Sequence, residues 1–181
     1  MREVRKSGRI GDRRKPGGRP RATLASLDEV IRLAVRFLSQ RDRTVAQVER
    51  FLQSRGVTSS HIEPAICRLT DLRYLDDLAY AQRWVERRLV TKPMGQERLK
   101  AELQTKGISD DLVDRVLTEV FLRNGEEVVA RRALQAMSHK GKGLAPVHVA
   151  RFLYQRGFSD EVIDRMMTEF TRSEDVVHEE E

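Results

Sequence analysis

Apolar side chains recur every three or four positions along most of the chain, which places them on one face of an α-helix. The first clear set is Leu27, Val30, Ile31, Ala34, Val35 and Leu38. No stretch alternates between apolar and polar residues for long enough to indicate a β-strand. The pattern therefore predicts an all-α protein.

The helical pattern itself repeats, with a period of about 50 residues. Each copy carries the signature Leu-x-x-(Arg/Lys)-Gly-apolar, and the three glycines are Gly56, Gly107 and Gly157. A glycine just after a helix adopts positive φ without steric cost, and the basic residue before it complements the helix dipole. The signature therefore indicates architecture rather than chemistry.

Each repeat is expected to contain three helices. The predicted helices cover residues 27–38, 45–55, 61–72, 77–89, 95–106, 110–122, 126–137, 146–156 and 160–170. Thr44 and Gln47 have the spacing of a capping box, and we expect the hydroxyls of Ser109 and Ser159 to cap the helices that follow them. The fold class is therefore three tandem three-helix repeats that form an extended, curved helical array.

Charge divides the chain into a body and two ends. We assign repeats to residues 23–75, 76–123 and 124–170. Residues 1–22 contain nine Lys or Arg and two acids (+7), and residues 171–181 contain one Arg and five acids (−4). Both ends lack the apolar residues that offset ordering entropy, so they are expected to be disordered. The basic arm indicates either a polyanionic neighbour or only a solubilising tail.

Few residues offer catalytic or metal-binding chemistry. The four histidines, His61, His139, His148 and His178, have no partner at metal-ligand spacing. The single cysteine, Cys67, lies between apolar residues and is expected to be buried. We therefore assign no catalytic, cofactor-binding or metal-binding residues, and expect no enzymatic activity. Because no apolar run reaches 18 residues and the N-terminus has no apolar core, we expect a cytoplasmic protein.

Basic residues of the body are the better candidates for function. The candidate set is Arg41, Arg43, Arg83, Arg87, Arg88, Lys92, Arg98, Lys100, Lys106, Lys140, Lys142, Arg151 and Arg156. One interpretation is a solvated helical surface without a partner. The other is a basic stripe that contacts nucleic acid or an acidic protein surface.

The sequence resembles the RecX family, whose members regulate the bacterial RecA recombinase. The resemblance covers about residues 30–170 and keeps the order of the three repeats. It is carried by Arg41-Asp-Arg-Thr-Val-Ala-Gln-Val-Glu-Arg-Phe-Leu52, Tyr74-Leu-Asp-Asp77, Tyr80-Ala-Gln-Arg-Trp84, Gly95-Gln-Glu-Arg-Leu-Lys-Ala-Glu-Leu-Gln-Thr-Lys-Gly-Ile108 and Arg151-Phe-Leu-Tyr-Gln-Arg-Gly-Phe158. Three positions depart from the family pattern: Arg73, where the family usually has glycine, Gln96, where it often has proline, and Pro93, in a loop where the family is usually basic.

The resemblance implies a non-enzymatic modulator, mainly an inhibitor, of RecA in recombination, DNA repair and the SOS response. Such a protein would lie, as a monomer, in the groove of the RecA filament on DNA and oppose filament growth, ATP hydrolysis and strand exchange. The alternative is a protein that binds single- or double-stranded DNA directly, through tandem three-helix units and the basic arm. A helical scaffold for another protein is a third interpretation.

Overall fold

The structure is a computed structural model that describes residues 26–138 and 145–178. Within these ranges the chain forms nine helices and no strand, which confirms the predicted all-α class. The helices are α1 (Leu27–Leu38), α2 (Val45–Ser54), α3 (Ser59–Asp71), α4 (Asp77–Thr91), α5 (Gln96–Thr105), α6 (Asp110–Asn124), α7 (Glu126–Ser138), α8 (Pro146–Gln155) and α9 (Asp160–His178).

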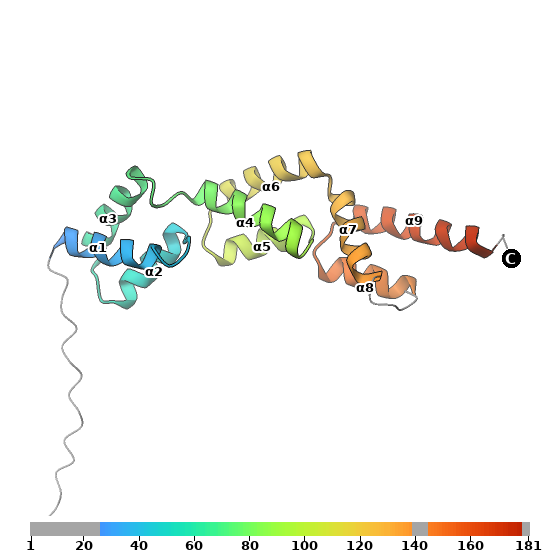
Figure 1. Cartoon of the computed structure of the whole chain (residues 1–181), viewed down its shortest axis with the longest axis horizontal. Helices are drawn as coiled ribbons and strands as arrows, with labels where there is room; N and C mark the ends of the chain where they lie inside the picture. Colours follow the sequence, from blue (N-terminus) through green and yellow to red (C-terminus); the bar gives the residue numbers. More distant parts are fainter. Residues whose placement is uncertain (1–25, 139–144, 179–181) are drawn as a thin grey trace, which may run out of the picture.

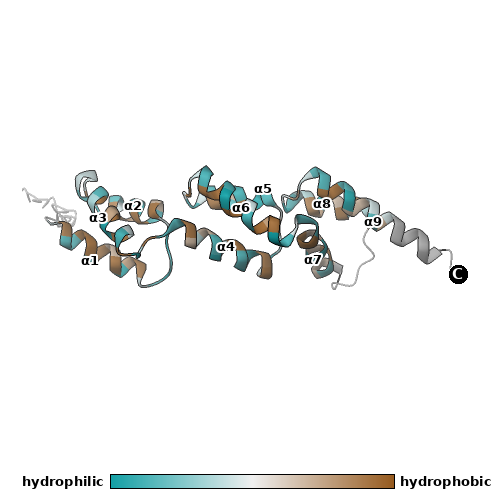
Figure 2. Cartoon of the chain, turned by 90° about the horizontal axis from the view of Figure 1, so that it is seen from above, coloured by the Kyte–Doolittle hydropathy of each residue, from teal (hydrophilic) through white to brown (hydrophobic). Residues whose placement is uncertain are grey.

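The helices form three consecutive three-helix units arranged in an extended row (Figure 1). We call α1–α3 unit 1, α4–α6 unit 2 and α7–α9 unit 3. The third helix of each unit packs against the first two. Apolar and polar residues occupy different sides of the individual helices, as Figure 2 shows. The row of units confirms the predicted tandem helical repeat.

The signature glycines close the middle helix of each unit as predicted. Gly56, Gly107 and Gly157 have φ values of 82°, 83° and 70°. The residue after each glycine donates its amide to the carbonyl of the signature leucine, as Val57 does to Leu52 at 3.2 Å. Each of these following residues is also buried. This arrangement is a Schellman motif, which satisfies carbonyls that a helix end leaves without a partner.

The described residues contain two hydrophobic cores rather than three. Unit 1 has its own core, in which Leu52 and Leu69 are fully buried. Units 2 and 3 share a larger core, in which Leu103 of α5 and Leu153 of α8 are fully buried. Units 2 and 3 are therefore one packed body, whereas the core of unit 1 is separate.

The predicted helix caps are confirmed only in part. The Thr44 hydroxyl accepts a hydrogen bond from the Gln47 amide at 3.3 Å, as expected for an N-cap. Ser109 occupies the N-cap position of α6, but its side chain makes no capping bond. The Ser159 hydroxyl donates to a carboxylate oxygen of Glu126 at 2.9 Å instead. The expectation for both serines was therefore wrong.

Cys67 is exposed, so the expectation that it is buried was wrong. The buried face of α3 is formed by Ile62, Ala65 and Leu69. These residues follow helical spacing, and position 67 lies on a different side of the same helix. Its apolar neighbours in sequence were therefore a poor guide to its environment.

The chain ends differ from expectation or lie outside the structure. α9 continues to His178, so most of the tail predicted to be disordered from residue 171 onward is helical. The basic arm at 1–22, Lys140 and Lys142 lie outside the described residues. No helix in the described part of the chain combines the length and apolar character needed to span a membrane.

Candidate basic cleft and the joints between units

Units 1 and 2 meet where the end of α5 reaches the start of α2. The hydroxyl of Thr44, the N-cap of α2, donates a 2.7 Å hydrogen bond to the carbonyl of Lys106, the C-cap of α5. Thr44 is completely buried, and its hydroxyl also accepts the bond from Gln47. The Val45 amide donates to a carboxylate oxygen of Asp77 at 2.9 Å. Groups that helix ends usually leave without partners are thus paired across the joint.

Units 2 and 3 are joined by the corresponding helix ends. The Gly95 amide, at the start of α5, donates to the Arg156 carbonyl at the end of α8 at 3.0 Å. The Glu97 amide donates to the Gly157 carbonyl at 3.2 Å. At both joints, therefore, the signature that ends one middle helix contacts the start of the middle helix in the preceding unit.

This contact gives two of the signature glycines a second role. A Cβ atom on Gly107 would lie 2.4 Å from the Ala46 Cβ, and one on Gly157 would lie 2.5 Å from the Arg98 backbone nitrogen. Real Cβ atoms do not approach other heavy atoms so closely. From the sequence, these glycines were explained by helix termination alone, and their close contact with the preceding unit was not predicted.

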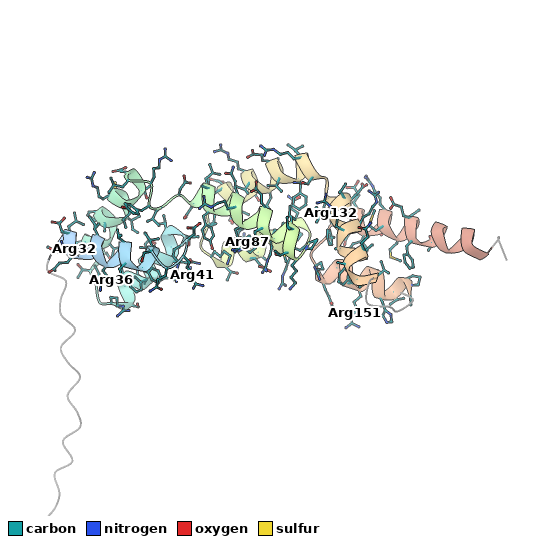
Figure 3. All side chains as sticks on the ribbon, viewed as in Figure 1. Arg32, Arg36, Arg41, Arg87, Arg132 and Arg151 are labelled. Carbon is teal, nitrogen blue, oxygen red and sulfur yellow. The ribbon has the colours of Figure 1, made fainter. Side chains whose placement is uncertain are left out.

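A cleft of about 590 Å³ lies beside the joint between units 1 and 2. Its lining comes from the loop before α2, from α2 and α4, and from the end of α5. The lining residues are Arg41, Asp42, Arg43, Gln47, Tyr80, Arg83, Trp84, Arg87 and Lys106. Five of these residues are basic and one is acidic. Figure 3 shows Arg41 at the end of unit 1 that lies beside unit 2, and Arg87 on unit 2.

Ring contacts and one ion pair hold part of the basic lining in place. The Arg43 guanidinium lies 4.2 Å from the centre of the Phe37 ring, which stacks on Phe51 at 3.9 Å. Arg83 pairs with Asp42 at 2.9 Å, which uses the only carboxylate of the lining. Arg41 and Arg87 have no ion-pair partner among the described residues. The cleft therefore has an excess of positive charge.

Burial, and to a smaller extent the excess positive charge, lowers the pKa of two basic side chains in the cleft. Burial lowers the pKa of Lys106, and the charges of Arg88, Arg87 and Arg41 act in the same direction, against the opposing effect of Glu102. Burial also lowers the pKa of Arg43, with a smaller contribution from Arg41. A nearby anion would reverse these effects, because it favours the charged form of each group.

Trp84 supports the cleft but offers little free surface to a ligand. Arg88 and Lys106 lie over its ring, at 5.3 Å and 5.0 Å from the ring centre. Its exposed fraction is only 7%. Arg88 is held further by a 2.6 Å ion pair with Glu102. Trp84 and Glu102 therefore position basic side chains.

The structure separates the predicted basic set into groups with different surroundings. Of the members that the structure describes, only Arg41, Arg43, Arg83, Arg87 and Lys106 are brought together at the cleft. Four others, Arg88, Arg98, Lys100 and Arg156, are engaged in contacts within the fold. The remaining described members, Lys92 and Arg151, are exposed, and Figure 3 places Arg151 far from the cleft.

Arg156 shows why a basic residue can be structural. Its guanidinium donates to the Pro93 carbonyl at 2.6 Å, across the joint between units 2 and 3. It also lies 4.7 Å from the centre of the Phe152 ring.

Two polar residues of the cleft lining, Gln47 and Tyr80, were not predicted from the sequence. Their place became evident only from the approach of α2 to α4.

The fold and the cleft define the chain as a tandem three-helix repeat protein with a basic cleft at its first joint. Among the described residues, no group of three or more His, Cys, Asp or Glu side chains is placed to hold a metal ion. The model of the first three-helix domain of RecX matches residues 31–69, and that of the second matches residues 76–117. Both matches support the RecX family for this chain.

Relatives and solved structures agree with this assignment. The chain is 34% identical over 110 residues to a protein of Lactobacillus delbrueckii subsp. bulgaricus named Regulatory protein RecX, and 33% identical over 86 residues to one of Prosthecochloris aestuarii. These matches cover 61% and 48% of this chain, and 41% and 57% of the relatives. The chain thus matches less than half of the Lactobacillus protein. The crystal structure of RecX from Lactobacillus salivarius matches with a TM-score of 0.66 and 26% identity, over 79% of this chain and 95% of that one.

Proposed function

We infer that this chain is a non-enzymatic regulator of RecA that binds the RecA filament on DNA. Bound in the filament groove, it opposes filament growth, ATP hydrolysis and strand exchange. The observation that carries the proposal is the extended row of units in a member of a family whose relatives are named regulatory proteins. A row of linked units can follow a helical groove over several subunits.

The basic cleft is the part of this row proposed to contact the filament. A groove that contains DNA has a negative electrostatic potential, which attracts basic side chains gathered in a cleft. Arg41 and Arg87 are the proposed contact residues, because both are exposed and have no ion-pair partner among the described residues. Arg88, which the sequence placed in the same set, is assigned to the fold because it pairs with Glu102.

The test measures RecA ATP hydrolysis and strand exchange on single-stranded DNA while the purified protein is added. We expect both activities to fall, and the protein to be retained on filaments more strongly than on bare DNA or free RecA. The Arg41→Glu, Arg87→Glu double variant should suppress RecA much less than the unchanged protein. The matched control is Arg32→Glu, Arg115→Glu, which makes the same charge change at exposed positions outside the cleft lining.

Two outcomes would contradict the proposal. If the unchanged protein alters neither activity and is not retained on filaments, regulation of RecA is wrong. If both double variants lose suppression equally, the cleft is not the contact.

A second function, direct DNA binding, is favoured by the five basic residues of the cleft. It predicts equal retention on bare DNA and on filaments, with an affinity that falls steeply with salt.

A further inference from the structure

The joint between units 1 and 2 differs from the joint between units 2 and 3 in what holds it. Units 2 and 3 share one hydrophobic core, but the core of unit 1 ends within unit 1. The first joint relies on polar contacts, such as Thr44 to Lys106, Val45 to Asp77 and Arg83 to Asp42. A joint of this kind opens at a lower cost than one sealed by a shared core.

Basic side chains face each other across this polar joint. Arg41 and Arg43 come from unit 1, whereas Arg87 and Lys106 come from unit 2. The charges of Arg41 and Arg87 both disfavour the protonated form of Lys106. Like charges on the two sides repel each other, and this repulsion weakens the joint when no anion is present.

The chemistry of the lining fits a phosphodiester backbone. Guanidinium groups bind phosphate oxygens through paired N–H donors. The cleft offers three arginines, Arg41, Arg43 and Arg87, whose guanidinium is not paired with a carboxylate of the described residues. The Nε of Arg43 is buried and has no hydrogen-bond partner among the described residues. The volume of about 590 Å³ lies within the range of small-ligand sites.

The same lining argues against base recognition and against an acidic protein segment. The ring of Trp84 is covered by two basic side chains and is only 7% exposed, so it cannot stack on a base. Protein partners usually anchor in a pocket through buried apolar or aromatic side chains. Beside the charged and amide groups, only Tyr80 and Trp84 line this cleft. Contact with a nucleic-acid backbone, independent of sequence, fits these features best.

We propose that the cleft binds the phosphodiester backbone of single-stranded nucleic acid, and that the bound phosphates hold unit 1 against unit 2. Phosphate between Arg41 and Arg43 on one side and Arg87 and Lys106 on the other replaces repulsion by attraction across the joint. Binding therefore fixes the angle of unit 1 relative to the body formed by units 2 and 3. This inference concerns the chain alone and does not depend on RecA.

The test uses the full chain, a 15-nucleotide oligothymidylate as probe and two measurements. Fluorescence anisotropy gives the affinity at several salt concentrations. Hydrogen exchange of the Val45 amide reports the joint, because that amide is bonded to Asp77 across it. We expect the oligonucleotide to slow exchange at Val45. Arg41→Glu, Arg87→Glu should weaken binding about tenfold or more, which corresponds to about 1.4 kcal/mol, and abolish the slowing.

The control is again Arg32→Glu, Arg115→Glu, which has the same net charge and keeps the basic arm. It should weaken binding much less and keep the slowing at Val45. Because the four arginines of the two variants are exposed, circular dichroism should show unchanged helix content in both.

Equal weakening of binding by the two variants would overturn the site, because only net charge would then matter. Unchanged exchange at Val45 in a saturated complex would overturn the effect on the joint. Tighter binding of a poly-glutamate peptide than of the oligonucleotide would assign the cleft to a protein partner instead.

Discussion

The close contact between Gly107 and Ala46 gives a quantitative prediction about the first joint. An alanine at 107 would adopt positive φ at a cost of about 1–2 kcal/mol. It would also place its Cβ 2.4 Å from the Ala46 Cβ, so units 1 and 2 must separate. Separation loses the hydrogen bond from Thr44 to Lys106, which contributes about 0.5–1.5 kcal/mol. The total expected loss is about 1.5–3.5 kcal/mol.

A double-mutant cycle separates the two effects. Ala46→Gly removes the atom that the new Cβ would meet, whereas the backbone cost at position 107 stays. Gly107→Ala should therefore cost less in the Ala46→Gly background than in the unchanged chain, by about 0.5–1.5 kcal/mol. Urea unfolding followed by circular dichroism at 222 nm measures each free energy. Simple additivity would refute the reasoning.

Gly56 provides the matched control for this cycle. It has nearly the same φ as Gly107, but it ends α2, whose start rather than whose end contacts unit 2. Gly56→Ala should cost about 1–2 kcal/mol from the backbone alone. Its effect should add to that of Ala46→Gly within about 0.5 kcal/mol, because the two positions lie almost three helical turns apart.

Three further predictions concern separate parts of the chain. Arg73 has a φ of 60°, so Arg73→Gly should raise the free energy of unfolding by up to about 1 kcal/mol in the same urea assay, and a loss would show that the side chain matters more than the backbone. Burial of Glu102 raises its pKa, but hydrogen bonds and charges from Arg88 and Arg98 outweigh this and hold the pKa below its usual value. The stability that this carboxylate contributes is present above the ordinary pKa of a glutamate and is lost as pH falls through the lowered pKa. Glu102→Gln should therefore reduce the fall in melting temperature between about pH 5 and pH 3. A chain that starts at Thr23 should keep its melting temperature and bind DNA with a shallower salt slope, because the removed arm carries a charge of +7; an unchanged slope would show that the arm does not contact DNA.

Helix positions could be predicted because they depend on residues close together in sequence. The spacing of apolar residues located all nine helices of the described chain, and the signature glycines located the ends of α2, α5 and α8. Side-chain environments that depend on the neighbouring helix were harder to predict. Cys67 was expected to be buried because its neighbours in sequence are apolar, although the buried face of its helix follows other positions.

The cleft illustrates the same limit for function. The sequence named thirteen basic residues but could not say which of them pair with acids. Arg98 lies one turn before Glu102 on α5, but Arg88 reaches the same carboxylate from α4, and only helix packing brings that pair together. Arg41 and Arg87 are 46 positions apart in sequence, and only the joint between units brings both to one cleft. Local patterns carry no information about such approaches.

The joints have a consequence for how a protein of this kind changes its length. Each joint pairs two different surfaces, the end of one middle helix and the start of another, so the contact has a direction. The three units form an open row rather than a ring (Figure 1). A duplicated unit would present the same helix end and helix start, so the backbone contact of the joint could be repeated, although the side chains around it differ between the two joints. Length is therefore a property that gene duplication can alter in steps of one unit, and each step extends the reach of the row along its partner.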